Sequence, residues 1–244
     1  MSTLYRYTLP VEQTDWNFDE QTETCFTWEY DEPRQALLAL YDKGKKQQWD
    51  AAERIDWSLD LDPENPMELD DRVIPIYGAD VWQKMTDKER RQVRHHLQAS
   101  QISQFMHGEQ GALIATAKIV QTVPDIDAKF YAATQVMDEA RHVEAYSRLL
   151  HEKFELAYPI THGLKALLEN GLTDRRRDMT YLTMQILIVP TVRDIGLWGP
   201  RVQKAFAEMG AMEFANVDAG ALLENDNNVA DQFDADMRVK SAAD

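Results

Sequence analysis

The feature that most limits the fold of this chain is a long apolar repeat that is interrupted once, at Pro124-Asp125. Before the interruption, apolar side chains recur every three or four positions between Ile102 and Val120, which is the spacing of one face of an α-helix. Thr86-Asp87-Lys88-Glu89 has the pattern of a capping box, which marks a helix start. We therefore predict a helix that begins after Thr86 and runs to about Val123.

The same spacing resumes after the proline and predicts a second long helix over about residues 126–156, with Asp125 as its N-cap. Shorter helices are expected over about 33–49, from Pro159 to Asn170-Gly171, and from Asp174 to Pro190. Residues 56–78 hold three prolines and are expected to form a long loop. No stretch alternates in the way that strands do, so the predicted class is all-α.

The two ends of the chain differ from this helical part. Residues 1–30 carry scattered aromatic side chains and are expected to form an extended arm that packs by its rings. The last part of the chain is acidic and poor in apolar periodicity, which is typical of a mobile tail. We therefore divide the chain into an N-terminal arm (1–32), a helical domain (33–210) and an acidic flexible tail (211–244).

Composition excludes several functions. The net charge of -16 argues against nucleic acid as a partner, because phosphate contacts need lysine and arginine. No apolar run reaches the ~18 residues that a membrane span requires, so no membrane partner is expected. Cys25 is the only cysteine, which rules out a disulfide within the chain and favours a cytoplasmic location.

Three side chains stand out within the two long helices. Glu139 and His142 lie on the apolar stripe of the second helix, and Glu109 lies on the apolar stripe of the first. Glu109 precedes Pro124 by fifteen residues, and Glu139 follows it by fifteen. If the helices fold back on each other, both carboxylates stand roughly 22 Å from the turn, at ~1.5 Å of rise per residue. The three groups are then expected to meet at one level of the hairpin.

This combination of residue types suits metal binding. A Glu on one helix facing a Glu-x-x-His motif on its neighbour is half of a dinuclear carboxylate site in a four-helix bundle. Glu-x-x-His alone is a weak signal, because on many helices it is a solvent-facing ion pair. Glu109, in an apolar stripe and at a matching height, favours the metal interpretation, since a buried carboxylate is costly without a partner.

Two stretches around these residues resemble a known family. GEQGAL (108–113) and MDEARHVE (137–144) are similar to segments of the ferritin-like di-iron carboxylate proteins. The resemblance is strongest to bacterial ferritin-like oxygenases related to the ribonucleotide reductase small subunit and to aminobenzoate N-oxygenase. It extends over about residues 34–188. It implies a ferritin-like helical bundle, an O2-dependent oxidation of a small organic substrate, and Glu109, Glu139 and His142 as ligands of a di-iron centre, with manganese as the alternative metal.

The chain departs from that family in one respect. Such proteins carry a second Glu and a second Glu-x-x-His on two further helices, and no other Glu-x-x-His occurs in this sequence. We therefore expect a bundle that lacks its second ligand-bearing helix pair. Two hypotheses follow: an oxygenase whose site is completed across a homodimer, or a non-catalytic helical scaffold or interaction protein derived from that family.

Overall fold

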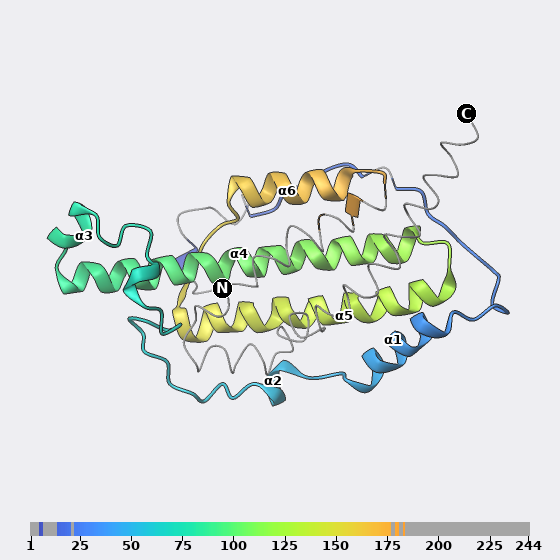
Figure 1. Cartoon of the computed structure of the whole chain (residues 1–244), viewed down its shortest axis with the longest axis horizontal. Helices are drawn as coiled ribbons and strands as arrows, with labels where there is room; N and C mark the ends of the chain where they lie inside the picture. Colours follow the sequence, from blue (N-terminus) through green and yellow to red (C-terminus); the bar gives the residue numbers. More distant parts are fainter. Residues whose placement is uncertain (1–4, 7–13, 21, 177–178, 181–182, 184–244) are drawn as a thin grey trace, which may run out of the picture.

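Two long antiparallel helices, α4 (Asp87–Thr122) and α5 (Ile126–Leu149), form the centre of the computed structural model (Figure 1). The structure describes residues 5–6, 14–20, 22–176, 179–180 and 183. The capping box is present at the start of α4, where the Thr86 hydroxyl accepts from the Glu89 amide and the Glu89 carboxylate accepts from the Thr86 amide. Asp125 caps α5 by accepting from the Ala128 amide at 2.9 Å. The predicted hairpin and the all-α class are confirmed.

A shorter helix flanks each member of the hairpin: α6 (His162–Thr173) packs along α4, and α1 (Gln35–Lys46) packs along α5 (Figure 1). Glycine makes the close approach possible on both sides. A Cβ on Gly111 of α4 would lie 2.3 Å from Leu168 Cδ2 of α6. A Cβ on Gly44 of α1 would lie 2.9 Å from Thr134 Oγ1 of α5. The two flanking helices therefore hold the hairpin from its two edges.

The remaining short elements lie between α1 and α4. They are α2 (Ala51–Arg54), a 3-10 turn (Asp71–Val73) and α3 (Asp80–Lys84). The predicted loop around them is anchored by Gln98, a fully buried residue of α4. Its side-chain oxygen accepts from the Met67 amide at 2.8 Å, and its nitrogen donates to Asn65 at 2.6 Å. A proline-rich loop is thereby fixed to the hairpin by one amide side chain.

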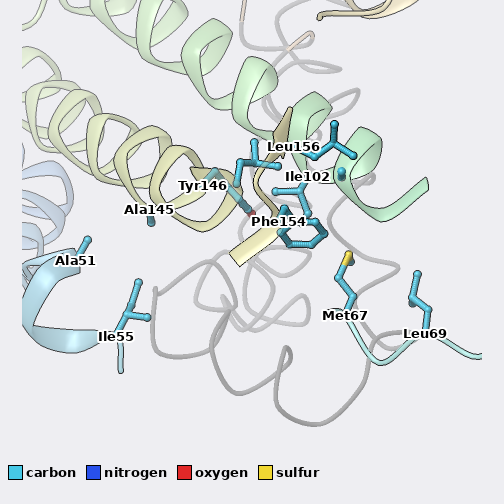
Figure 2. Close-up of a cluster of buried hydrophobic side chains, with 11 residues drawn as sticks. Ala51, Ile55, Met67, Leu69, Ile102, Ala145, Tyr146, Phe154 and Leu156 are labelled. Atoms are coloured by element: carbon cyan, nitrogen blue, oxygen red, sulfur yellow. The ribbon is translucent and has the colours of Figure 1, made fainter. Parts of the chain in front are cut away.

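The main apolar core joins the hairpin to α2 and to this loop. Figure 2 shows Ile102, Tyr146 and Phe154 grouped together, with the α2 and loop side chains on either side. Tyr146 of α5 and Ile102 of α4 are fully buried at its centre. Its members are Ala51, Ile55, Met67, Leu69, Ala99, Ile102, Ala145, Tyr146, Leu150, Phe154 and Leu156. The end of the hairpin away from the Pro124 turn is therefore filled by apolar packing, which begins one turn beyond the predicted site.

The C-terminal end of α5 differs from the prediction. The α-helix ends at Leu149 instead of about 156, and Leu150–Phe154 form a single π-helical turn. Glu155 then takes a left-handed conformation with φ 50°, which ends the helix. The next residues, β2 (Leu156–Ala157), pair in parallel with β1 (Tyr5–Arg6). Two-residue strands leave no alternating pattern in a sequence.

The predicted end of α6 is wrong. We expected Asn170-Gly171 to stop this helix, but it continues to Thr173. Gly171 lies inside it, where a Cβ would come within 2.4 Å of Thr183 Oγ1. The glycine therefore serves close packing, which a sequence pattern cannot distinguish from a C-cap. The helix also begins later than Pro159, at His162, with Thr161 as its N-cap.

The N-terminal arm follows the prediction only in its first part. Trp16 and Phe18 pack against the apolar contact between α4 and α6. Phe26, Trp28 and Tyr30 are exposed, because the chain there is held by backbone contact with the end of α4 while these rings point outward. Most of the helix predicted after Asp174 and the whole predicted tail (211–244) lie outside the described residues. Within the described part, no helix has the length and apolar character that crossing a membrane requires.

Candidate metal centre

The hairpin brings Glu109, Glu139 and His142 together, as their spacing from the turn predicts. One oxygen or nitrogen atom from each residue lies within 4.8 Å of the other two. His142 Nδ1 is 3.3 Å from Glu109 Oε2 on the neighbouring helix and 3.2 Å from Glu139 Oε2 on its own helix. Among the residues that the structure describes, this is the only group of three or more metal-binding side chains with such a geometry.

The three side chains are withdrawn from solvent. Glu139 is 7% exposed and His142 is 5% exposed, and the Glu109 side chain is 15% exposed. Each residue sits on the stripe of its helix that faces the other helix, so the burial follows from the 3.6-residue period. Two carboxylates therefore share a buried space with a single imidazole. A buried excess of negative charge is unfavourable unless protons or a cation balance it.

The pKa values of the metal-free cluster reflect this imbalance. Burial raises the pKa of Glu139 to about 8, and the neighbouring Glu109 carboxylate adds to the effect. Burial alone would lower the pKa of His142, but its hydrogen bonds to Glu109 and Glu139 outweigh that effect and raise it to about 10. Burial opposes ionisation of Glu109 too, but the contact with His142 lowers its pKa. At neutral pH, two protons thus compensate the charge of the two carboxylates.

The donor set fits a transition-metal ion. Carboxylate oxygen and imidazole nitrogen are the donors that iron and manganese accept, and the two carboxylates supply the charge that a divalent ion needs. Nδ1 of His142, the nitrogen that faces both carboxylates, would be the donor atom for such an ion. Three ligands from one chain would leave other coordination positions of an ion open. The arrangement of these donors would suit one half of a dinuclear carboxylate site, or a three-ligand mononuclear site.

The aromatic surroundings of the site come from the two hairpin helices and from a segment that is distant in the sequence. Tyr146, one turn beyond His142, is fully buried, and its ring centroid lies 6.3 Å from that of Phe105. Burial raises the pKa of the Tyr146 hydroxyl well above its ordinary range, so this residue stays protonated. Trp49, from the segment between α1 and α2, places its ring 6.1 Å from that of His142. No spacing in the sequence indicates this contact, because the two residues belong to distant segments.

The other five histidines do not reach the site. Three of them, on α4, contact the segments around Pro63 and Tyr158: His95 with the Pro63 carbonyl, His96 with the Tyr158 hydroxyl, and His107 with the Tyr158 carbonyl. The remaining two, His151 and His162, are exposed. All six histidines of the sequence lie between residues 95 and 162, within the described part. These 244 residues therefore supply one imidazole to the site.

Comparison with known proteins agrees with this site. The profile of the p-aminobenzoate N-oxygenase AurF family matches residues 31–163, which is more than half of the chain. The chain belongs to this family. The AurF family is di-iron and ferritin-like, and the matched region contains α1, the α4–α5 hairpin and all three clustered side chains. No curated protein and no solved structure matches the sequence significantly.

Proposed function

We propose that this AurF-family chain binds iron through Glu109, Glu139 and His142, and that the bound metal uses O2 to oxidise a small organic substrate. The observation that carries the proposal is the buried cluster of two carboxylates and one imidazole within 4.8 Å of one another. Membership of the AurF family supports iron as the metal, and manganese is the alternative that the same donors accept. The family description makes arylamines such as p-aminobenzoate the first substrates to test.

The residues of the chain have separate tasks in this proposal. Glu109 and Glu139 offset the charge of the metal, and His142 offers a neutral nitrogen through Nδ1. Iron, when bound, supplies the redox chemistry with O2. The ligands must lose their protons to bind, so Glu139 and His142 each release a proton when the metal enters. Burial of all three side chains keeps bulk water away from this position.

A complete dinuclear site needs more ligands than the described part of the chain brings together. We propose that a second copy of the chain supplies them, because two copies of Glu109, Glu139 and His142 give four carboxylates and two imidazoles. That number equals the ligand complement of a di-iron carboxylate centre. The absence of a second Glu-x-x-His motif from the sequence supports an intermolecular source. A homodimer is the assembly that this proposal requires, and we propose the cytoplasm as its location because the chain has a single cysteine.

The first experiment measures iron per chain after aerobic reconstitution with Fe(II), on protein separated by size. About one iron per chain in a dimer, lost in Glu139→Ala, supports the shared dinuclear site. Glu144→Ala is the matched control, since Glu144 is an exposed carboxylate on the same helix. Iron bound to a monomer contradicts the shared site and favours three-ligand mononuclear binding. No bound iron in any oligomer contradicts the oxygenase proposal and leaves the scaffold hypothesis.

A second experiment tests the reaction. O2 uptake is followed with a chemical reductant and a panel of arylamines, and oxidised nitrogen products are identified by mass spectrometry. The wild-type protein is expected to consume O2 in a substrate-dependent way, and Glu139→Ala is expected to lose this uptake. Uptake that is equal in the two proteins would come from free iron and would contradict the proposal.

A further inference from the structure

Trp49 lies against the candidate metal centre although nothing in its sequence position indicates this. It belongs to the segment that joins α1 to α2 and is half-buried. Its ring centroid is 6.1 Å from that of the His142 imidazole, with 36° between the planes. The indole also packs against the apolar core that contains Ala145, one turn beyond Arg141. Trp49 therefore touches α5 on the side next to the clustered ligands.

Two arginines hold the indole ring. The guanidinium carbon of Arg54 lies 5.7 Å from the ring centroid, and that of Arg141 lies 6.0 Å from it. A guanidinium at this distance from an indole is attracted by the negative face of the ring. Arg141 is itself fixed, because it donates to Asp138 at 2.6 Å and to the Gln48 side chain. The indole is thus restrained through a network that extends from α2 to α5.

Arg141 and His142 are consecutive residues of α5, and Trp49 contacts both. Consecutive helical side chains point about 100° apart, so the indole lies between the directions of the Arg141 and His142 side chains. An indole in this place would limit rotation of the imidazole about its Cβ–Cγ bond. The orientation matters because only Nδ1 faces both carboxylates, at 3.2 Å and 3.3 Å. A flipped ring would present carbon to the carboxylates instead of a nitrogen ligand.

We infer that Trp49 is a positioning residue for His142: its indole, held by Arg54 and Arg141, keeps Nδ1 directed at the metal position between Glu109 and Glu139. The inference rests on the proposed metal binding by these three side chains. Groups that orient a histidine ligand typically change metal affinity by about 10- to 100-fold when they are removed. A tryptophan that only fills space would change stability without changing the ligand field of the metal.

The test uses Co(II), whose visible spectrum reports the donor atoms and geometry of its site. Full-length wild type, Trp49→Phe and Trp49→Leu are titrated, and the melting temperature of each metal-free protein is measured separately. We expect Trp49→Leu to bind Co(II) about tenfold more weakly, with an altered spectrum. Trp49→Phe keeps an aromatic plane beside the imidazole and is expected to restore most of the affinity and the wild-type spectrum.

Trp57→Leu is the matched control. Trp57 is also a half-buried tryptophan beside the same core and under an arginine, with Arg148 4.3 Å from its ring. No ring contact joins it to His142 among those found in the described residues. Trp57→Leu is expected to lower the melting temperature and to leave the Co(II) spectrum unchanged.

The outcomes separate the inference from the proposed function. If wild type binds no Co(II) or Fe(II), the proposed function fails and the role of Trp49 fails with it. If wild type binds Co(II), loses it in His142→Ala, and Trp49→Leu matches Trp57→Leu in affinity and spectrum, the metal site stands and the positioning role is overturned. Should Trp49→Leu not fold, Trp49→Met replaces it, because a flexible thioether fills the space without holding a plane. Wild-type affinity and spectrum in Trp49→Met would equally overturn the role.

Discussion

Helix α4 carries two buried charged clusters that differ in charge balance. Around Lys118, the ammonium group donates to the carbonyls of Leu172 and Asp174 at 2.5 and 2.7 Å and lies 3.0 Å from the Glu20 carboxylate. Its side chain is 2% exposed, and its three N–H donors meet three acceptors. Around Glu109, two carboxylates meet one imidazole. The first cluster is complete as it stands, and the second needs protons or a cation.

We propose that this difference distinguishes a charge that serves the fold from one that serves metal binding. Lys118 joins three segments, namely the arm, α4 and the end of α6, and its charge is matched by one carboxylate. The three side chains of the Glu109, Glu139 and His142 cluster come from the two hairpin helices, and one carboxylate is in excess over the imidazole. Perturbed pKa values accompany the second cluster, as is common at functional sites. Four predictions test this contrast.

The largest expected effect comes from breaking the balanced cluster. Lys118→Met removes the Lys118 donor from the Leu172 and Asp174 carbonyls and leaves the Glu20 carboxylate without its cation. It is expected to lower the free energy of unfolding by about 3 kcal/mol. Urea denaturation followed by circular dichroism measures this loss. Lys165→Met, which changes a less buried lysine on α6, is the control and is expected to cost much less. A loss for Lys118→Met as small as that of the control would show that the cluster is not structural.

Substitution in the unbalanced cluster is expected to have the opposite effect on the stability of the metal-free protein. Glu139→Gln removes the excess carboxylate but keeps its shape, so the metal-free protein should unfold with an equal or higher free energy. Metal binding should weaken by about 100-fold, which corresponds to about 2.7 kcal/mol. Denaturation in the presence of a chelator and metal titration measure the two effects. A large loss of metal-free stability would mean that Glu139 serves the fold instead of a cation.

The pH dependence of the metal-free protein follows from the same imbalance. Glu139 has a folded pKa of about 8, raised from 4.5, and His142 has one of about 10, raised from 6.5. Between the ordinary pKa of each group and its raised pKa in the folded protein, the folded protein binds more protons than the unfolded one. Stability therefore falls as pH rises through these two windows. We expect the melting temperature without metal to fall steadily from pH 5 to pH 9. Glu139→Gln should flatten the lower half of this slope, and an unchanged slope would contradict the assignment.

The smallest effect is expected from a substitution at the start of α4, far from both clusters. Thr86→Ala removes the hydroxyl of the capping box and is expected to lower the free energy of unfolding by about 1 kcal/mol. Metal affinity should stay at the wild-type value, because the cap lies well away from Glu109. A change in the metal affinity of Thr86→Ala would indicate that any loss of helix stability weakens metal binding. The affinity changes of the other variants would then have to be corrected for their loss of stability.

Local patterns were sufficient for the hairpin and for its three clustered side chains. The capping box, the proline turn and the 3.6-residue period are short-range signals, and two equal distances from one turn fix a common height. The same signals were insufficient for α6. Gly171 has the local appearance of a helix stop, but the approach of Thr183 explains it. From the sequence alone, a glycine required by close packing cannot be distinguished from a glycine required by a left-handed backbone conformation.

The sequence by itself determined an all-α chain, a helical hairpin, and the meeting of Glu109, Glu139 and His142 at one level. Each of these depends on the regular geometry of single helices and one turn. Only the tertiary structure decided that Lys118 is bound by Glu20 and the end of α6, and that Trp49 lies against His142. Such contacts join segments whose relative positions depend on the packing of the whole core. That packing is set by shape and volume, which no short spacing in a sequence encodes.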